Sequence, residues 1–129
     1  MMSPLMEIEK LAQHYFDALY RGDVELFRTI FHPNARLFSV NGGAETVLNV
    51  DQYLSIVSDR ENPVDRGDPR QDQILSIDLS TSTTAVLKTR ELFLPKRFTD
   101  DLGLVRWSGG WRIVAKIWDF ELIEEGFKP

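Results

Sequence analysis

Three side chains in this 129-residue sequence have chemistry suited to moving a proton: the phenol of Tyr15, the imidazole of His32 and the carboxyl of Asp119. Each lies in or beside an apolar stretch, and burial shifts the pKa of such groups toward the range where acid–base catalysis operates. We therefore treat them as candidate catalytic residues. The alternatives are a core tyrosine bonded to the backbone, a histidine that caps a helix end and a solvated aspartate.

A second group of residues has the chemistry to hold a ligand. Lys116 and Trp118 share one face of the last strand-like run, and Arg90 lies on one face of an earlier run. If both faces turn inward, the two cations lie beside Trp118 and suit a flat, anionic ligand. If they turn outward, they belong to a dimer surface. The candidate ligand-binding residues are Phe38, Tyr53, Arg90, Trp107, Lys116 and Trp118.

Composition argues against several other functions. The chain has no Cys and only two His, so we expect no metal site. Its formal net charge of −5 gives no broad positive field for nucleic acid. The glycine pairs at 42–43 and 109–110 read as tight turns and not as phosphate-binding loops, and we expect no cofactor.

The beginning of the chain and its hydropathy bear on location. The N-terminal residues show no basic region followed by an apolar run, so we expect no signal peptide. No stretch approaches the roughly 18 apolar residues that would span a bilayer. These patterns predict a cytoplasmic protein without membrane association.

The elements that would position these residues begin with two helices. Apolar residues recur at helical spacing from Leu5 to Leu19, with Ser3 and Pro4 as a start signal and Gly22 as a stop signal. Asp23 is placed to cap a second, shorter helix that ends before Pro33.

The rest of the chain predicts strands, interrupted by one helix and one loop. Residues 35–40 and 45–50 suit a hairpin, Asp51 suits the cap of a third helix, and the polar stretch 58–73 suits an irregular loop or a lid. Further strands are predicted over residues 74–79, 83–94, 98–107 and 111–123. The last strand is apolar on both alternating faces, which indicates that a second copy of the protein covers one of them.

Three sequence segments carry a resemblance to a known superfamily. They are Tyr15-Phe16-Asp17-Ala18-Leu19-Tyr20-Arg21-Gly22-Asp23, Phe31-His32-Pro33-Asn34-Ala35 and Gly110-Trp111-Arg112-Ile113-Val114-Ala115-Lys116-Ile117-Trp118. With this element order, the chain resembles nuclear-transport-factor-2-like (NTF2-like) proteins, in particular small bacterial members of the SnoaL-like or putative lumazine-binding type. The resemblance implies an α+β fold over residues 1–129 as a single domain, with a strongly curved antiparallel sheet wrapped around N-terminal helices. It also implies a pocket at the open end of this cone and a homodimer through the outer sheet face.

The function that this resemblance implies is less specific than the fold. Tyr15 matches the oxyanion-stabilising tyrosine of ketosteroid isomerases, but their catalytic carboxylate would fall at about Ser39 and the partner acid near Gly103, where this sequence has no acid. We therefore expect binding of a small, flat, partly anionic organic molecule in an apolar pocket. The alternatives are a cofactor-independent isomerase, dehydratase or cyclase that uses the same pocket, and a dimeric structural module.

Overall fold

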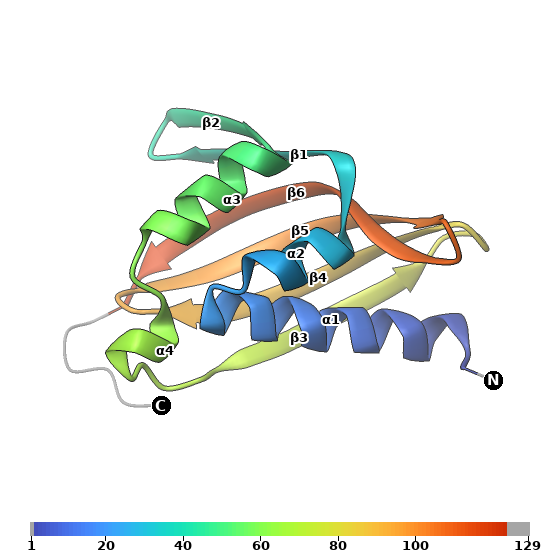
Figure 1. The fold of residues 1–129 in the computed structure, drawn as a ribbon, viewed down its shortest axis with the longest axis horizontal. Coiled ribbons are helices and arrows are strands. Elements are labelled where there is room, and N and C mark those ends of the chain that lie inside the picture. The colour runs from blue at the N-terminus through green and yellow to red at the C-terminus, as the bar shows by residue number, and fades with distance from the viewer. Residues whose placement is uncertain (1, 124–129) are drawn as a thin grey trace.

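The computed structural model describes residues 2–123, which form a mixed α+β fold with one six-stranded sheet (Figure 1). Its elements, in chain order, are α1 (Pro4–Arg21), α2 (Val24–Ile30), β1 (Phe31–Asn41), β2 (Ala44–Asn49), α3 (Val50–Asp59), α4 (Pro63–Arg66), β3 (Asp72–Leu79), β4 (Thr84–Phe93), β5 (Lys96–Trp107) and β6 (Gly110–Leu122). No helix within this part of the chain is long and apolar enough to cross a membrane.

Local sequence signals account for the helix ends. The hydroxyl of Ser3 accepts a hydrogen bond from the amide of Met6 at 3.2 Å, and Gly22 ends α1 in the left-handed conformation with φ of 65°. Asp23 caps α2 as expected. The third helix differs from the prediction, because Asn49 and not Asp51 is its N-cap. Asn49 and Gln52 exchange hydrogen bonds in a capping box.

The strands follow the order β2-β1-β6-β5-β4-β3. All neighbouring pairs are antiparallel except β1 and β6, which run parallel. The α2 helix leads directly into β1, so the Phe31-His32-Pro33 segment that we expected at a helix end begins a strand instead. Pro33 is tolerated at the start of this strand, where the β1–β6 pairing is irregular between Phe31 and Arg36.

The core lies between the helices and one face of the sheet, against which α1, α2 and α3 pack (Figure 1). Its fully buried members include Tyr15 and Phe16 of α1, Phe27 of α2, Leu37 of β1 and Leu102 of β5. The alternation of buried and exposed residues along β1 and β4 follows from this one-sided packing.

A β-bulge in β6 decides which side chains face the helices. Gly103 of β5 pairs with Ala115, but the next residue, Leu104, pairs with Ile113, so Val114 has no partner in β5. One extra residue exchanges the two faces of a strand. Ile113 is therefore fully buried, yet the residue on the same face after the bulge is Lys116, and Ile117 is 56% exposed. Strict alternation along this strand, which would put Ile113 and Ile117 on one face, is therefore wrong at this point.

Candidate functional site

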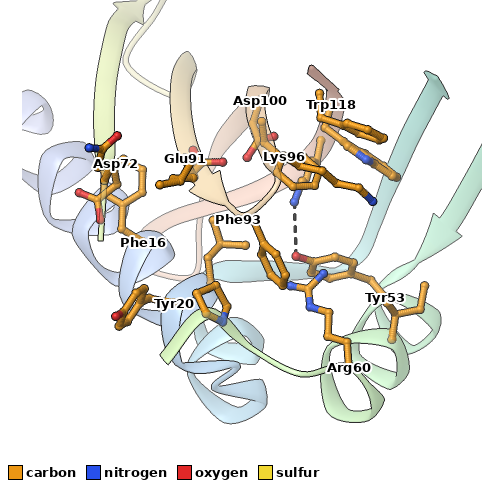
Figure 2. A pocket seen from close by; sticks show the side chains of 18 of the residues that line it. Phe16, Tyr20, Tyr53, Arg60, Asp72, Glu91, Phe93, Lys96, Asp100 and Trp118 are labelled. Atoms are coloured by element: carbon orange, nitrogen blue, oxygen red, sulfur yellow. Dashed lines mark hydrogen bonds between the residues drawn. The ribbon is translucent and has the colours of Figure 1, made fainter. Parts of the chain in front are cut away.

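A cavity of about 230 Å³ lies between the inner sheet face, α1 and the α3–α4 segment (Figure 2). Its walls are mainly aromatic and aliphatic, from Phe16, Leu19, Leu48, Tyr53, Ile56, Leu92, Phe93, Phe98, Trp118 and Phe120. Ligand sites for drug-sized molecules usually begin at about 300 Å³, so this cavity suits a smaller molecule. Flat apolar walls of this kind favour a ring system.

Three ionisable residues form the inner end of the cavity, and we call Glu91, Asp100 and Lys116 the acid–lysine cluster. They come from the neighbouring strands β4, β5 and β6 and are 7%, 1% and 5% exposed. Buried charges are costly unless they are paired, so such a cluster in an apolar cavity is a candidate functional site.

Tyr15 packs beneath the acid–lysine cluster. It is fully buried and does not itself line the cavity. Its hydroxyl donates a hydrogen bond to Oδ2 of Asp100 at 2.5 Å. Burial raises the pKa of Tyr15 well above its usual value, and the negative charge of Asp100 adds to this shift. Tyr15 is therefore a neutral donor that positions the Asp100 carboxylate.

The two carboxyl groups of the cluster influence each other. Burial raises the pKa of Glu91 well above its usual value, and the charge of Asp100 raises it further. Oε2 of Glu91 and Oδ1 of Asp100 are both buried. A hydrogen bond between the two carboxyl groups also contributes to the raised pKa of Glu91, so the pair acts as one coupled group at the inner end of the cavity.

The ammonium of Lys116 lies among the aromatic rings of Tyr15, Tyr53 and Trp118. Its Nζ is 4.8 Å from the ring centroid of Tyr53 and 5.6 Å from that of Trp118, and it hydrogen-bonds to the Tyr53 hydroxyl at 3.3 Å. Burial lowers the pKa of Lys116, but attraction to Tyr53 and to the two acids outweighs that effect, so the pKa is raised overall. Lys116 is therefore a fixed positive charge.

Two further cations line the cavity, Arg60 at the end of α3 and Lys96 at the start of β5. Arg60 follows α3, and Figure 2 shows it beside Tyr53 and Phe93, on the opposite side from Glu91 and Asp100. Within the described residues, neither Arg60 nor Lys96 has a carboxylate within 4.0 Å. Both cations therefore bring positive charge to the cavity that the described acids do not neutralise.

The structure brings together four of the residues singled out from sequence. Tyr53, Lys116 and Trp118 line the cavity, and Tyr15 lies directly behind it.

Besides Tyr15, five of the residues singled out from sequence lie outside the cavity lining. Phe38 is 45% exposed on the outer sheet face, because its neighbour Leu37 faces the core. Arg90 lies on the face opposite Glu91 for the same reason of alternation.

The remaining three lie far from the cavity in the fold or point to solvent. His32 and Trp107 contact each other edge to face, with ring centroids 4.6 Å apart, and neither lines the cavity. Asp119 is exposed, and its pKa is lowered by hydrogen bonds from the Asn41 side chain and the Phe120 amide, so it is not the buried acid that the strand pattern suggested.

Sequence analysis missed Glu91, Asp100 and Arg60. The resemblance to ketosteroid isomerases placed any partner acid of Tyr15 near Gly103, but Asp100 supplies that partner three residues earlier. The alternation of β4, in which Thr89 and Glu91 share the buried face, was the available signal for Glu91. Within residues 2–123, no group of three or more His, Cys, Asp or Glu side chains is arranged to hold a metal ion.

Solved structures share this fold. An NTF2-like protein of unknown function from Silicibacter pomeroyi matches with a TM-score of 0.80 and 22% identity, over 91% of this chain and 95% of its own. A ketosteroid isomerase-like protein from Erwinia carotovora atroseptica matches with 0.71 and 13%, over 93% and 98%. A cystatin-like fold protein from Burkholderia xenovorans matches with 0.69 and 16%, over 92% and 92%. At these identities the likeness shows the fold, which is NTF2-like.

The family within this superfamily follows from the sequence match. A family model described as "Putative lumazine-binding" matches residues 3–119, which is most of the chain. The chain therefore belongs to the putative lumazine-binding family. Among curated proteins, none matches this sequence.

Proposed function

We propose that this protein binds a small, flat, partly anionic organic molecule in the cavity. The observation that carries the proposal is the combination of aromatic walls with cations, Arg60 and Lys96, that have no carboxylate partner among the described residues. The family's name refers to lumazine, a flat heterocycle, and this supports the same class of ligand. A cavity of about 230 Å³ limits the ligand to a compact ring system.

The test is to identify what the protein carries out of cells and whether it sits in this cavity. Native mass spectrometry of protein purified without denaturation should show a bound small molecule. Ile56→Trp places a bulky ring at a half-exposed position of the cavity wall and should abolish that signal. Val64→Trp, at a similarly exposed position on α4 outside the lining, should leave it unchanged. Absence of any ligand, or its retention in Ile56→Trp, contradicts the proposal.

A second candidate function is proton transfer to or from the bound molecule. It is favoured by one observation, the buried carboxyl pair of Glu91 and Asp100, two residues that line the cavity. A carboxyl group whose pKa is raised by burial can give and take a proton closer to neutral pH than a solvated one can. An isomerase, dehydratase or cyclase would need such a pair.

Hydrogen exchange detects this activity without knowledge of the full reaction. The co-purified ligand, incubated with protein in D2O, should lose C–H signals in its NMR spectrum faster than without protein. Glu91→Gln should abolish this exchange, and Tyr15→Phe should slow it severely while the protein stays folded, because the Asp100 carboxylate loses its donor. Exchange that is unchanged in both variants removes the catalytic role.

We also propose a homodimer through the outer sheet face. Val47, Phe38 and Ile117 are register neighbours on this face and are 44%, 45% and 56% exposed. Adjacent to them, Asp101 and Lys88 form an ion pair at 3.5 Å. An apolar row beside a charged pair can match a second copy of itself across a two-fold axis.

A structural module without a ligand is the third interpretation. It expects a cone filled by the protein's own side chains. The open cavity and the unpartnered cations do not favour it.

A further inference from the structure

The position of Arg60 is set by the end of α3. It is the C-cap residue, and its amide donates to the carbonyl of Ile56 at 3.0 Å. Its guanidinium carbon lies 4.8 Å from the ring centroid of Phe93 and 5.9 Å from that of Tyr53. Two aromatic side chains and a fixed backbone therefore hold the guanidinium in place, so its orientation is a property of the folded protein.

The unpaired donors of Arg60 lie on one edge of the guanidinium. Nε and Nη2 are both buried, and neither has a hydrogen-bond partner within residues 2–123. These two N–H groups are parallel neighbours, and together they match the two oxygens of a carboxylate. Buried charged donors without partners are costly, which indicates that something outside the described chain satisfies them.

Neighbouring arginines on the same side of the cavity are already paired. Arg70 bonds to Asp17 at 2.5 Å and to Asp72 at 2.9 Å, and Arg66 bonds to Asp68 at 2.6 Å. Arg66 has a similar environment to Arg60, because its guanidinium also lies over the ring of Phe93, at 5.0 Å from the centroid. The two arginines differ in two ways: Arg60 lines the cavity and Arg66 does not, and the Nε and Nη2 donors of Arg60 have no hydrogen-bond partner among the described residues.

The charge at the opposite end of the cavity fixes the direction of an anionic ligand. The Glu91 and Asp100 oxygens there attract hydrogen-bond donors and repel a carboxylate. Lys116 lies near the two acids and the ring of Tyr53, and its positive charge offsets the negative charge of the acids. An anion is therefore favoured at Arg60 and disfavoured at the acid–lysine cluster.

We propose that Arg60 binds the carboxylate of the ligand through Nε and Nη2, and that the ligand is a planar aromatic or heteroaromatic carboxylic acid. This inference rests on the proposed function of the cavity and names its substrate class. The carboxylate lies against the edge of the Arg60 guanidinium, and the attached ring extends among the aromatic walls. The guanidinium fork also matches phosphate, but a cavity of about 230 Å³ that already holds an aromatic ring leaves less space for a tetrahedral group than for a planar carboxylate.

The experiment measures binding of simple probes by isothermal titration calorimetry. Benzoate, 2-naphthoate and indole-3-carboxylate are compared with the neutral benzamide and with phenylphosphonate. At least one carboxylate should bind, and its amide and phosphonate counterparts should bind at least about tenfold more weakly. Arg60→Gln should weaken carboxylate binding by about ten- to hundredfold, the loss expected for a charged hydrogen-bonded pair. Arg60→Lys, which keeps the charge without the fork, should recover only part of that loss.

Arg66→Gln is the matched control, because it removes a cation over the same ring that is already bonded to Asp68. It should change carboxylate affinity by no more than about twofold, and thermal unfolding should show that both variants are folded. Equal binding of carboxylate and amide, an unaffected Arg60→Gln, or tighter binding of the phosphonate overturns the inference. If no carboxylate binds although a co-purified ligand occupies the cavity, the inference fails and the proposed function stands. If neither probe nor cellular ligand binds, both fail.

Discussion

At the scale of residues, the cavity separates two kinds of polar group. Glu91, Asp100 and Lys116 occupy the buried end, and Arg60 lies across the aromatic space from the two acids. Because burial raises the pKa of Glu91 and the charge of Asp100 raises it further, the folded protein keeps the two acids in an unfavourable setting. Binding sites commonly hold such groups at the expense of stability.

The raised pKa of Glu91 gives a pH-dependent stability. In the unfolded chain Glu91 is ionised above about pH 4.5, whereas the folded protein keeps the proton to higher pH, so unfolding releases a proton. The free energy of unfolding should therefore fall as pH rises above about 4.5. Glu91→Gln removes this contribution, and the variant should match the native protein at pH 4 and exceed it in stability at pH 8.

Urea unfolding across that pH range measures the effect. Glu9→Gln, at an exposed position on α1, serves as the control and should follow the native curve. Parallel pH profiles for Glu91→Gln and the native protein would show that Glu91 is not held protonated.

At the scale of elements, the end of α1 and the α3–α4 segment are joined by one close contact. A side chain at Gly22, where φ is 65°, would place its Cβ 2.1 Å from Nδ2 of Asn62. Asn62 precedes α4, and its backbone N–H donates a hydrogen bond to Oδ2 of Asp65 at 3.3 Å. This contact holds the segment that carries Arg60 and Pro63 beside the cavity.

A pair of glycine substitutions separates this contact from simple backbone strain. Gly67 ends α4 with φ of 70° and has open space around it, so Gly67→Ala should cost only about 1–2 kcal/mol for the left-handed conformation. Gly22→Ala should cost roughly 1–3 kcal/mol more, because Asn62 must also move. Chemical denaturation gives both values, and equal costs would mean that the Asn62 contact contributes nothing.

At the scale of the whole molecule, the sheet has two different faces. One packs on the helices and contributes the cavity, and the other exposes the row of Val47, Phe38 and Ile117. Exposed apolar rows of this kind usually mark an interface.

The proposed homodimer predicts a change of mass in solution. Ile117→Asp places a charge in the centre of that row and should convert a dimer to a monomer, because an unpaired charge cannot be buried at the contact. Val64→Asp, at a half-exposed position on α4, should leave the assembly unchanged. Sedimentation equilibrium distinguishes the two species. A native protein that sediments as a monomer would contradict the dimer.

The sequence by itself determined the features that depend on neighbouring residues. Ser3, Gly22 and Asp23 predicted helix ends correctly because a cap acts within a few residues of the chain. The glycine turns, the α+β class and the NTF2-like resemblance were also confirmed. Tyr15 was singled out correctly as a buried residue that requires a partner.

Only the tertiary structure decided which side chains meet in the cavity. Lys116 faces inward because an unpaired residue at Val114 exchanges the faces of β6, and strict alternation does not predict a bulge. Asp100 bonds to Tyr15 although the two are 85 positions apart in the sequence, and Arg60 comes from a segment that was predicted to be a loop. Each of these contacts depends on the register of distant strands, which packing of the whole sheet sets and no local pattern encodes.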